Sequence, residues 1–225
     1  MPFPGRVSLL LSVLTAAACS SMTHDSDFAH VPPTCGQVVV VRALPGAPTQ
    51  AVVQACVRRD GRWIVVPPTW PAVVGRSGIV AAARKREGDG GTPVGVHAIG
   101  PAFGAAPTCA TRLRYRQATA RDWWIDDPTS PAYNTWVTRD REPAVSAEAM
   151  ARTDGQYELG AVLGWNTDPV VAGRGSAIFL HVWKGPDEPT SGCVALARAD
   201  VAALLAWLDP AAGPCLVVVA PDVDD

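Results

Sequence analysis

The sequence predicts a mainly β fold with one or two short helices in a single domain. Of its 225 residues, 48% are apolar and 18% are charged, which is enough apolar surface for a core and too little charge for a disordered chain. The 21 proline and 20 glycine residues separate short, valine-rich runs without any period. This pattern is typical of strands joined by turns and excludes collagen and coiled-coil chains.

The expected strands are short runs rich in β-branched or aromatic residues, most of them bounded by glycine or proline. In chain order they are residues 37–42, 62–66, 78–84, 95–99, 111–117, 123–126, 157–165, 177–183 and 216–220.

One helix is expected over residues 200–209, because its apolar residues recur at spacings of three and four. Asp200 lies near the positive N-terminal end of this helix, and Pro210 would stop it. A second, shorter helix is expected over residues 146–152. The apolar face of the first helix is formed by Val201, Leu204, Leu205 and Leu208.

The N-terminus has the features of an export signal. In residues 1–18, one positive charge precedes the apolar run 7–18, which is too short for a permanent membrane span. Cleavage after the A-x-A ending of this run would release a plain secreted protein, whereas cleavage before Cys19 would leave that cysteine lipidated and the protein anchored to a membrane. Residues 19–34 would then be a flexible tether and residues 35–225 the folded domain. Either cleavage places the protein in the periplasm or cell envelope.

The net charge and the spacing of cysteine and histidine residues argue against nucleic acid, an anionic membrane and zinc as partners. The formal net charge of −2 gives no reason to expect nucleic acid or an anionic membrane as the main partner. The sequence contains no C-x-x-C or H-x-x-x-H spacing, so a zinc site is not expected.

Export changes how the cysteines after Cys19 are interpreted, because an oxidising compartment would pair four of the five and leave one thiol free. Cys193 differs from the others because it lies in the tight turn 189–194, whose glycine allows close approach of a ligand to the backbone. The remaining four are candidates for structural disulfides, and the sequence leaves their pairing open: Cys35, Cys56, Cys109 and Cys215.

A free thiol needs a base, and few histidines are available. His24 and His30 lie in the expected tether, which leaves His97 and His181. Alternation along residues 177–183 places His181 on one strand face with Phe179 and Trp183. The following turn could return Cys193 beside His181, where an imidazole would activate the thiol. The alternatives are a core histidine and a disulfide-bonded Cys193.

The motifs around these residues resemble a known family. Gly-Arg-Gly-Ser-Ala-Ile-Phe-Leu-His at 173–181, followed by Pro-Thr-Ser-Gly-Cys-Val-Ala-Leu at 189–196, is similar to the catalytic core of the L,D-transpeptidases, the YkuD-type domain of bacterial cell-wall enzymes. Upstream, Glu-Gly-Asp-Gly-Gly-Thr-Pro-Val-Gly at 87–95 resembles the T-P-x-G signature of that family. Asp126-Asp127 and Tyr-Asn-Thr-Trp at 133–136 are similar to its substrate-side region.

The resemblance implies a YkuD-like β-sandwich and a cysteine acyltransferase that needs no cofactor. Cys193 matches the nucleophile that attacks a peptidoglycan stem tetrapeptide, and His181 matches the base. The resemblance also implies that the Val182 backbone carbonyl orients His181 and that Ser191 and Gly192 belong to the oxyanion turn. An amine acceptor would resolve the thioester, which cross-links the wall or attaches a protein to it. Inhibition by carbapenems is expected.

This chain departs from the commonest family pattern, Ser-His-Gly-Cys-Ile/Val-Arg. It has Thr-Ser-Gly-Cys-Val-Ala at 190–195 and resembles a subgroup written S-G-C-V-A-L, so recognition that depends on the arginine does not carry over. Candidate substrate contacts are Tyr133, Trp183, Thr190 and Arg174, with a core position for Tyr133 and a solvated turn for Arg174 as the alternatives. His97 is expected to pack beside the cleft. A stem-peptide hydrolase and a non-catalytic wall-binding lipoprotein remain the alternative functions.

Overall fold

The computed structural model describes residues 25–221. The expected signal peptide, Cys19 and His24 lie outside the described residues. Within residues 25–221, no helix is long and apolar enough to cross a membrane.

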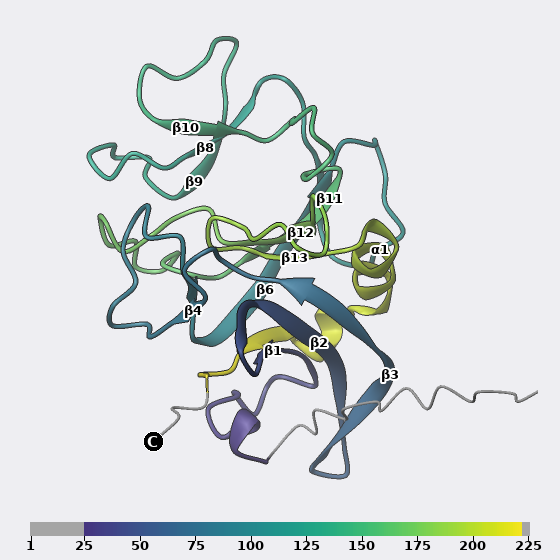
Figure 1. The fold of residues 1–225 in the computed structure, drawn as a ribbon. Helices are drawn as coiled ribbons and strands as arrows, with labels where there is room; N and C mark the ends of the chain where they lie inside the picture. Colours follow the sequence, from purple (N-terminus) through teal and green to yellow (C-terminus); the bar gives the residue numbers. More distant parts are fainter. Residues whose placement is uncertain (1–24, 222–225) are drawn as a thin grey trace, which may run out of the picture.

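The centre of the molecule is a closed barrel of mixed strands (Figure 1). The strands follow the order β11-β12-β13-β3-β2-β1-β14-β6, and a pairing between β6 and β11 closes the ring. β1 runs parallel to β14 and β12 runs parallel to β13, whereas the other neighbours in the ring are antiparallel. The barrel strands are β1 (Gln37–Leu44), β2 (Ala47–Arg59), β3 (Arg62–Val73), β6 (Gly95–Gly104), β11 (Leu159–Leu163), β12 (Phe179–Val182), β13 (Val194–Leu196) and β14 (Cys215–Val218).

The predicted mainly β fold in a single body is confirmed, and the sheets of the expected sandwich are opposite walls of one closed barrel. β6 makes this closure possible because its first residues pair with β14 and its last residues pair with β11. Closure leaves few unpaired strand edges, which are otherwise open to association with other chains.

Apolar residues inside the barrel and on the helix form one core. Val39 and Val41 of β1 share this core with Leu180 of β12, and all three are buried. Helix α1 (Arg198–Trp207) adds Val201, Leu204 and Leu205 to it. The predicted helix is therefore confirmed, although it begins two residues earlier than expected.

A small three-stranded sheet covers the barrel at the end shown uppermost in Figure 1. It consists of β8 (Asp122–Ile125) between β9 (Thr135–Thr138) and β10 (Ala147–Ala149). The second predicted helix, over 146–152, is wrong, because β10 occupies this segment and pairs with β8. A pairing with a distant strand has overridden the local preference of a short segment.

The sequence did not predict one long barrel strand, β2, and the elements not yet described are short. Cys56 is fully buried within β2. The short elements are η1 (Asp25–Phe28), β4 (Ile79–Val80), β5 (Thr92–Pro93), β7 (Tyr115–Gln117) and η2 (Pro210–Ala212).

The described residues contain one disulfide, between Cys35 and Cys215. It joins the segment before β1 to the neighbouring strand β14. The expectation of two disulfides is corrected, because Cys56 and Cys109 are both free thiols. Cys56 packs with the disulfide in an apolar cluster on the outer face of the barrel, beside Val38 and Val40 of β1. Cys109 packs against the core inside the barrel, so the two free thiols belong to different clusters.

The segment before the disulfide is also attached to the barrel. Phe28 stacks on Trp63 of β3 with ring centroids 4.9 Å apart, and Asp27 forms an ion pair with Arg42 of β1. Residues 25–34 therefore pack against β1–β3, which corrects the expectation of a flexible tether for this part of the chain.

Loss of the disulfide should destabilise the protein, because the bond closes a loop with a sequence separation of 180 residues. We expect Cys35→Ala with Cys215→Ala to lower the free energy of unfolding by about 2–5 kcal/mol, measured by urea denaturation without reductant. The matched control, Cys109→Ala, should change it by less than about 1 kcal/mol. Equal effects of the two changes would contradict the assignment of Cys109 as a free, non-structural thiol.

Candidate active site

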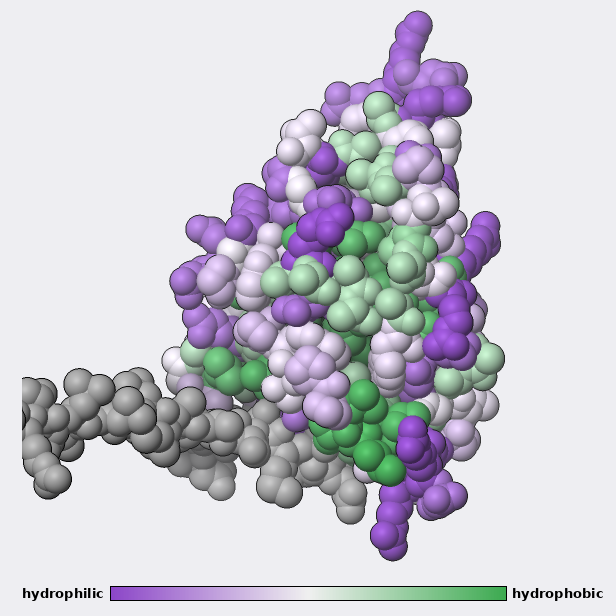
Figure 2. Space-filling model, turned by 90° about the vertical axis from the view of Figure 1, so that its right-hand side faces the viewer, coloured by the Kyte–Doolittle hydropathy of each residue, from purple (hydrophilic) through white to green (hydrophobic). Residues whose placement is uncertain are grey.

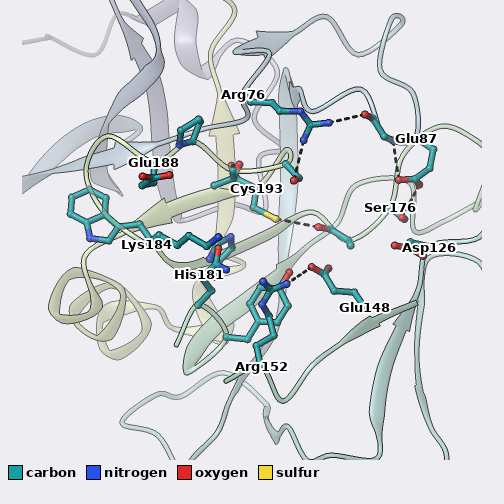
Figure 3. Close-up of a pocket in the computed structure, with 18 of the residues that line it drawn as sticks. Arg76, Glu87, Asp126, Glu148, Arg152, Ser176, His181, Lys184, Glu188 and Cys193 are labelled. Atoms are coloured by element: carbon teal, nitrogen blue, oxygen red, sulfur yellow. Dashed lines mark hydrogen bonds and ion pairs between the residues drawn. The ribbon is translucent and has the colours of Figure 1, made fainter. Parts of the chain in front are cut away.

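A pocket of about 440 Å³ lies where β12 and the Cys193 turn face the small sheet. Both residues of the predicted catalytic pair, Cys193 and His181, line it (Figure 3). Charged side chains of both signs surround them. The charged residues of the lining are Arg76, Lys85, Glu87, Asp126, Glu148, Arg152, Lys184 and Glu188.

The Cys193 thiol is buried against the backbone before and within β12. Its sulfur accepts a hydrogen bond from the Phe179 amide at 3.4 Å and donates one to the Ala177 carbonyl at 3.2 Å. Burial raises the pKa of Cys193 to about 12, and the nearby Glu148 carboxylate acts in the same direction. At neutral pH the resting thiol is therefore protonated.

Only glycine fits immediately before the cysteine. Gly192 has φ +139°, and a Cβ atom on it would lie 2.9 Å from the Gly91 carbonyl oxygen. The turn thus brings Gly192 against the backbone of Gly91, which immediately precedes the T-P-x-G segment.

Two threonine hydroxyls hold the Cys193 carbonyl. Thr92 Oγ1 accepts a hydrogen bond from the Gly75 amide and donates to Cys193 O at 3.3 Å. Thr190 Oγ1 accepts from the Gly192 amide and donates to Cys193 O at 2.7 Å. Each hydroxyl is used as both acceptor and donor, so these two residues lock the turn that carries the sulfur.

This arrangement changes the expectations for the turn. Thr190 lines the pocket, but its hydroxyl, expected to contact substrate, is occupied by Gly192 and Cys193. The Gly192 amide donates to Thr190 and is not available as an oxyanion donor. The exposed Ser191 also lines the pocket, and its hydroxyl accepts a hydrogen bond from Arg76 at 3.1 Å.

The backbone carbonyl of the next residue holds His181 in one tautomer. Its Nδ1 lies 2.8 Å from the Val182 carbonyl oxygen, the contact implied by the family resemblance. A carbonyl only accepts hydrogen bonds, so Nδ1 carries the proton and the lone pair is on Nε2. Burial lowers the pKa of His181 to about 4, which keeps the ring neutral above that pH.

The small sheet and the segment after it supply a group of pocket residues that the sequence analysis did not identify. Tyr157 is buried and packs edge-on against the His181 ring, with centroids 5.3 Å apart. Arg152 lies over Tyr157 and forms an ion pair with Glu148 at 3.0 Å. Burial raises the pKa of Glu148. No sequence signal marked these residues, because the wrongly predicted helix 146–152 covered Glu148 and Arg152.

Asp126 stands beside this group. One of its carboxylate oxygens is buried and has no hydrogen-bond partner among the described residues. Asp126 and Glu148 lie on one side of Cys193, whereas Lys184 and Glu188 lie on the other (Figure 3).

The structure does not bring Tyr133 and Arg174 to the pocket lining. Tyr133 is buried, and its hydroxyl donates to the carboxylate of Glu87, which also accepts from Ser176. Arg174 donates to the Ala82 carbonyl. Trp183, in contrast, lines the pocket as expected from its place beside His181.

His97, which was expected to pack beside the cleft, lies outside the pocket lining, whereas Glu87 is part of it. His97 is buried outside the pocket lining, with Nε2 3.0 Å from the Pro93 carbonyl and its ring against Trp165. Glu87 lines the pocket. Within residues 25–221, no group of three or more His, Cys, Asp or Glu side chains is arranged to hold a metal ion.

The model of the L,D-transpeptidase (YkuD) catalytic domain matches residues 48–219. The chain belongs to this family. A search of curated proteins and a search of solved structures each found no match. The YkuD domain implies an enzyme of the L,D-transpeptidase family with peptidoglycan substrates, and the disulfide is consistent with a location outside the cytoplasm.

Alkylation of Cys193 should show that its resting thiol is protonated, because only the small thiolate fraction reacts. Because burial raises the pKa of Cys193 to about 12, its alkylation rate should rise about tenfold per pH unit from about pH 7 to about pH 10, without a plateau. Peptide-resolved mass spectrometry after brief iodoacetamide treatment measures this rate. His181→Ala should show the same slope, and a plateau near neutral pH in the wild type alone would instead indicate a resting thiolate–imidazolium pair.

The threonine lock should contribute to stability. Thr190→Val leaves the buried Gly192 amide without an acceptor and removes one of the two hydroxyl donors to the Cys193 carbonyl, so we expect a loss of about 1–3 kcal/mol in the free energy of unfolding. Thr190→Ser keeps the hydroxyl and should stay within about 1 kcal/mol of wild type. The two variants behaving alike would refute the proposed lock.

Proposed function

We propose that this protein is a peptidoglycan L,D-transpeptidase in which Cys193 is the nucleophile and His181 the base. The observation that supports this most directly is that a pocket in a YkuD domain is lined by an unpaired cysteine and by a histidine whose tautomer presents Nε2 as a proton acceptor.

The first half of the proposed reaction acylates the enzyme. The Cys193 sulfur attacks the carbonyl between the third and fourth residues of a stem tetrapeptide, and its proton passes to His181 Nε2. The imidazolium then returns that proton to the leaving amine of the fourth residue as the C–N bond breaks. The Val182 carbonyl holds the Nδ1 proton throughout and stabilises the transient positive charge on the ring.

Burial explains why this base is needed. A thiol with a pKa of about 12 is almost entirely protonated at neutral pH, so proton transfer must accompany the attack. The amides of Ser191 and Cys193 would stabilise the tetrahedral oxyanion, because the Gly192 amide is bonded to Thr190.

The second half transfers the acyl group to an amine. Asp126 and Glu148 place carboxylates in the pocket wall on one side of Cys193, and the unpartnered oxygen of Asp126 suits an ammonium group of the acceptor. These carboxylates favour a cationic acceptor over water. The bound ammonium first loses a proton to solvent. As the resulting neutral amine attacks the thioester, His181 Nε2 accepts its second proton and delivers it to the Cys193 sulfur when the C–S bond breaks, which forms the new amide and regenerates the thiol.

The proposal also includes the setting of the enzyme. An export signal over residues 1–18 and lipid on Cys19 would hold the domain at a membrane of the cell envelope, where peptidoglycan is within reach. The products would be wall cross-links or proteins attached to the wall.

Covalent labelling tests the nucleophile. A carbapenem should add one adduct to the purified protein, because opening of its lactam by Cys193 mimics acylation. Cys193→Ala should give no adduct, and His181→Ala should slow labelling by about 100- to 10,000-fold. Cys109→Ala, which removes another free thiol, serves as the matched control and should label like wild type. Intact-mass spectrometry showing an unchanged adduct on Cys193→Ala would refute the assignment.

Incubation with a disaccharide-tetrapeptide then separates transfer from hydrolysis. Formation of a cross-linked dimer supports the proposed transpeptidase. Loss of the terminal residue without a dimer would show that water resolves the thioester and that the protein is a hydrolase on the same scaffold.

A further inference from the structure

The end of the β2–β3 hairpin carries a local positive charge that the whole-chain charge conceals. Arg58, Arg59 and Arg62 are all exposed there, and Asp60 in the turn is the one acidic residue within 57–66. Apolar side chains lie directly beside them, because Ile64 and Val65 are 45% and 37% exposed. Figure 2 shows strongly hydrophobic residues next to hydrophilic ones at the lower end of the molecule, where Figure 1 places this hairpin.

The strand register places Arg59, Arg62 and Ile64 on one face of the hairpin. Arg59 pairs directly with Arg62, and Val57 pairs with Ile64 on the same side of the hairpin. Like charges opposite each other destabilise a hairpin. Within residues 25–221, neither arginine forms an ion pair or a side-chain hydrogen bond that would offset this repulsion. An anionic partner outside the chain would remove the repulsion.

The first described residues of the chain pack against the same hairpin. Phe28 stacks on Trp63 of β3, and Arg58 both lies over Trp63 and donates to the Pro33 carbonyl. Phe28 lies nine positions after Cys19, a span of at most about 32 Å when fully extended. A membrane attachment through the apolar run 7–18 or through Cys19 would therefore hold the hairpin close to a bilayer.

We propose that the end of the β2–β3 hairpin docks on an anionic lipid surface. Arg59 and Arg62 contact the headgroups, and Ile64 reaches the boundary with the acyl chains. The small sheet lies at the opposite end of the barrel (Figure 1), so this orientation turns the catalytic pocket away from the membrane and toward the wall. The net charge of −2 argues against a membrane as the main partner, but docking depends on the local charge.

Vesicle flotation tests the docking with the full chain carrying Cys19→Ser, which removes any lipid. Binding should be stronger to vesicles that contain phosphatidylglycerol than to phosphatidylcholine vesicles. R59Q/R62Q should weaken binding to the anionic vesicles about 30-fold, at about 1 kcal/mol for each arginine at the surface. The matched control R139Q/R141Q removes the same charge from exposed positions near the small sheet and should change binding less than about threefold.

Hydrogen–deuterium exchange locates the contact independently of any binding by the N-terminal segment. Anionic vesicles should protect the amides of residues 57–66 and leave those around the exposed Val170 and Val171 unchanged. The proposal is overturned if R59Q/R62Q binds like wild type, if residues 57–66 gain no protection, or if the arginines bind a soluble polyanion but not vesicles.

These tests distinguish a loss of membrane docking from a loss of the proposed catalytic activity. R59Q/R62Q should keep the wild-type rate of carbapenem labelling in solution, because neither arginine lines the pocket. Its unfolding midpoint should equal or exceed that of wild type, which shows that lost vesicle binding does not come from misfolding.

Discussion

Strand β12 is the element on which the site depends, because it is shared between two cores. Its alternate residues Leu180 and Val182 point into the barrel, whereas Phe179 and His181 point toward the small sheet. Pairing with β11 on one side and with β13 on the other fixes its register. A one-residue slip would place His181 in the barrel core and Leu180 in the pocket, so core packing and the position of His181 are a single constraint.

The chemistry of the pocket follows from burial against this strand. Desolvation moves the pKa of Cys193 up and that of His181 down, and both shifts favour a neutral thiol beside a neutral imidazole. In the reaction proposed above, this neutral pair exchanges its proton as the sulfur attacks the bound acyl group. The charged wall outside it, with Glu148 and Asp126 on one side, supplies the polar contacts that this neutral centre lacks.

The sequence predicted the local motif around Cys193 and His181 better than it predicted the residues that surround them. The alternation in 177–183 and the glycine turn at 189–194 pointed to His181 and Cys193, because these patterns are local, and the resemblance to the L,D-transpeptidase motifs favoured a catalytic role over a core histidine and a disulfide. Tyr133 and Arg174 were expected to touch substrate, yet Tyr133 braces Glu87 and Arg174 bonds the Ala82 carbonyl. Glu148 was hidden in a segment whose short-range pattern suggested a helix, and only its pairing with β8 made it a strand facing the pocket.

The sequence by itself determined the mainly β class and the helix with its buried leucines, and it predicted that Cys193 and His181 share one site, since each of these features depends on a short stretch of chain. The tertiary structure decided barrel closure, the single disulfide, and which polar groups are available. Thr190 and Gly192 illustrate the reason. Their residue types allow either substrate contact or internal hydrogen bonding, and the choice depends on Cys193 O and Thr92, which the fold brings together from distant parts of the chain.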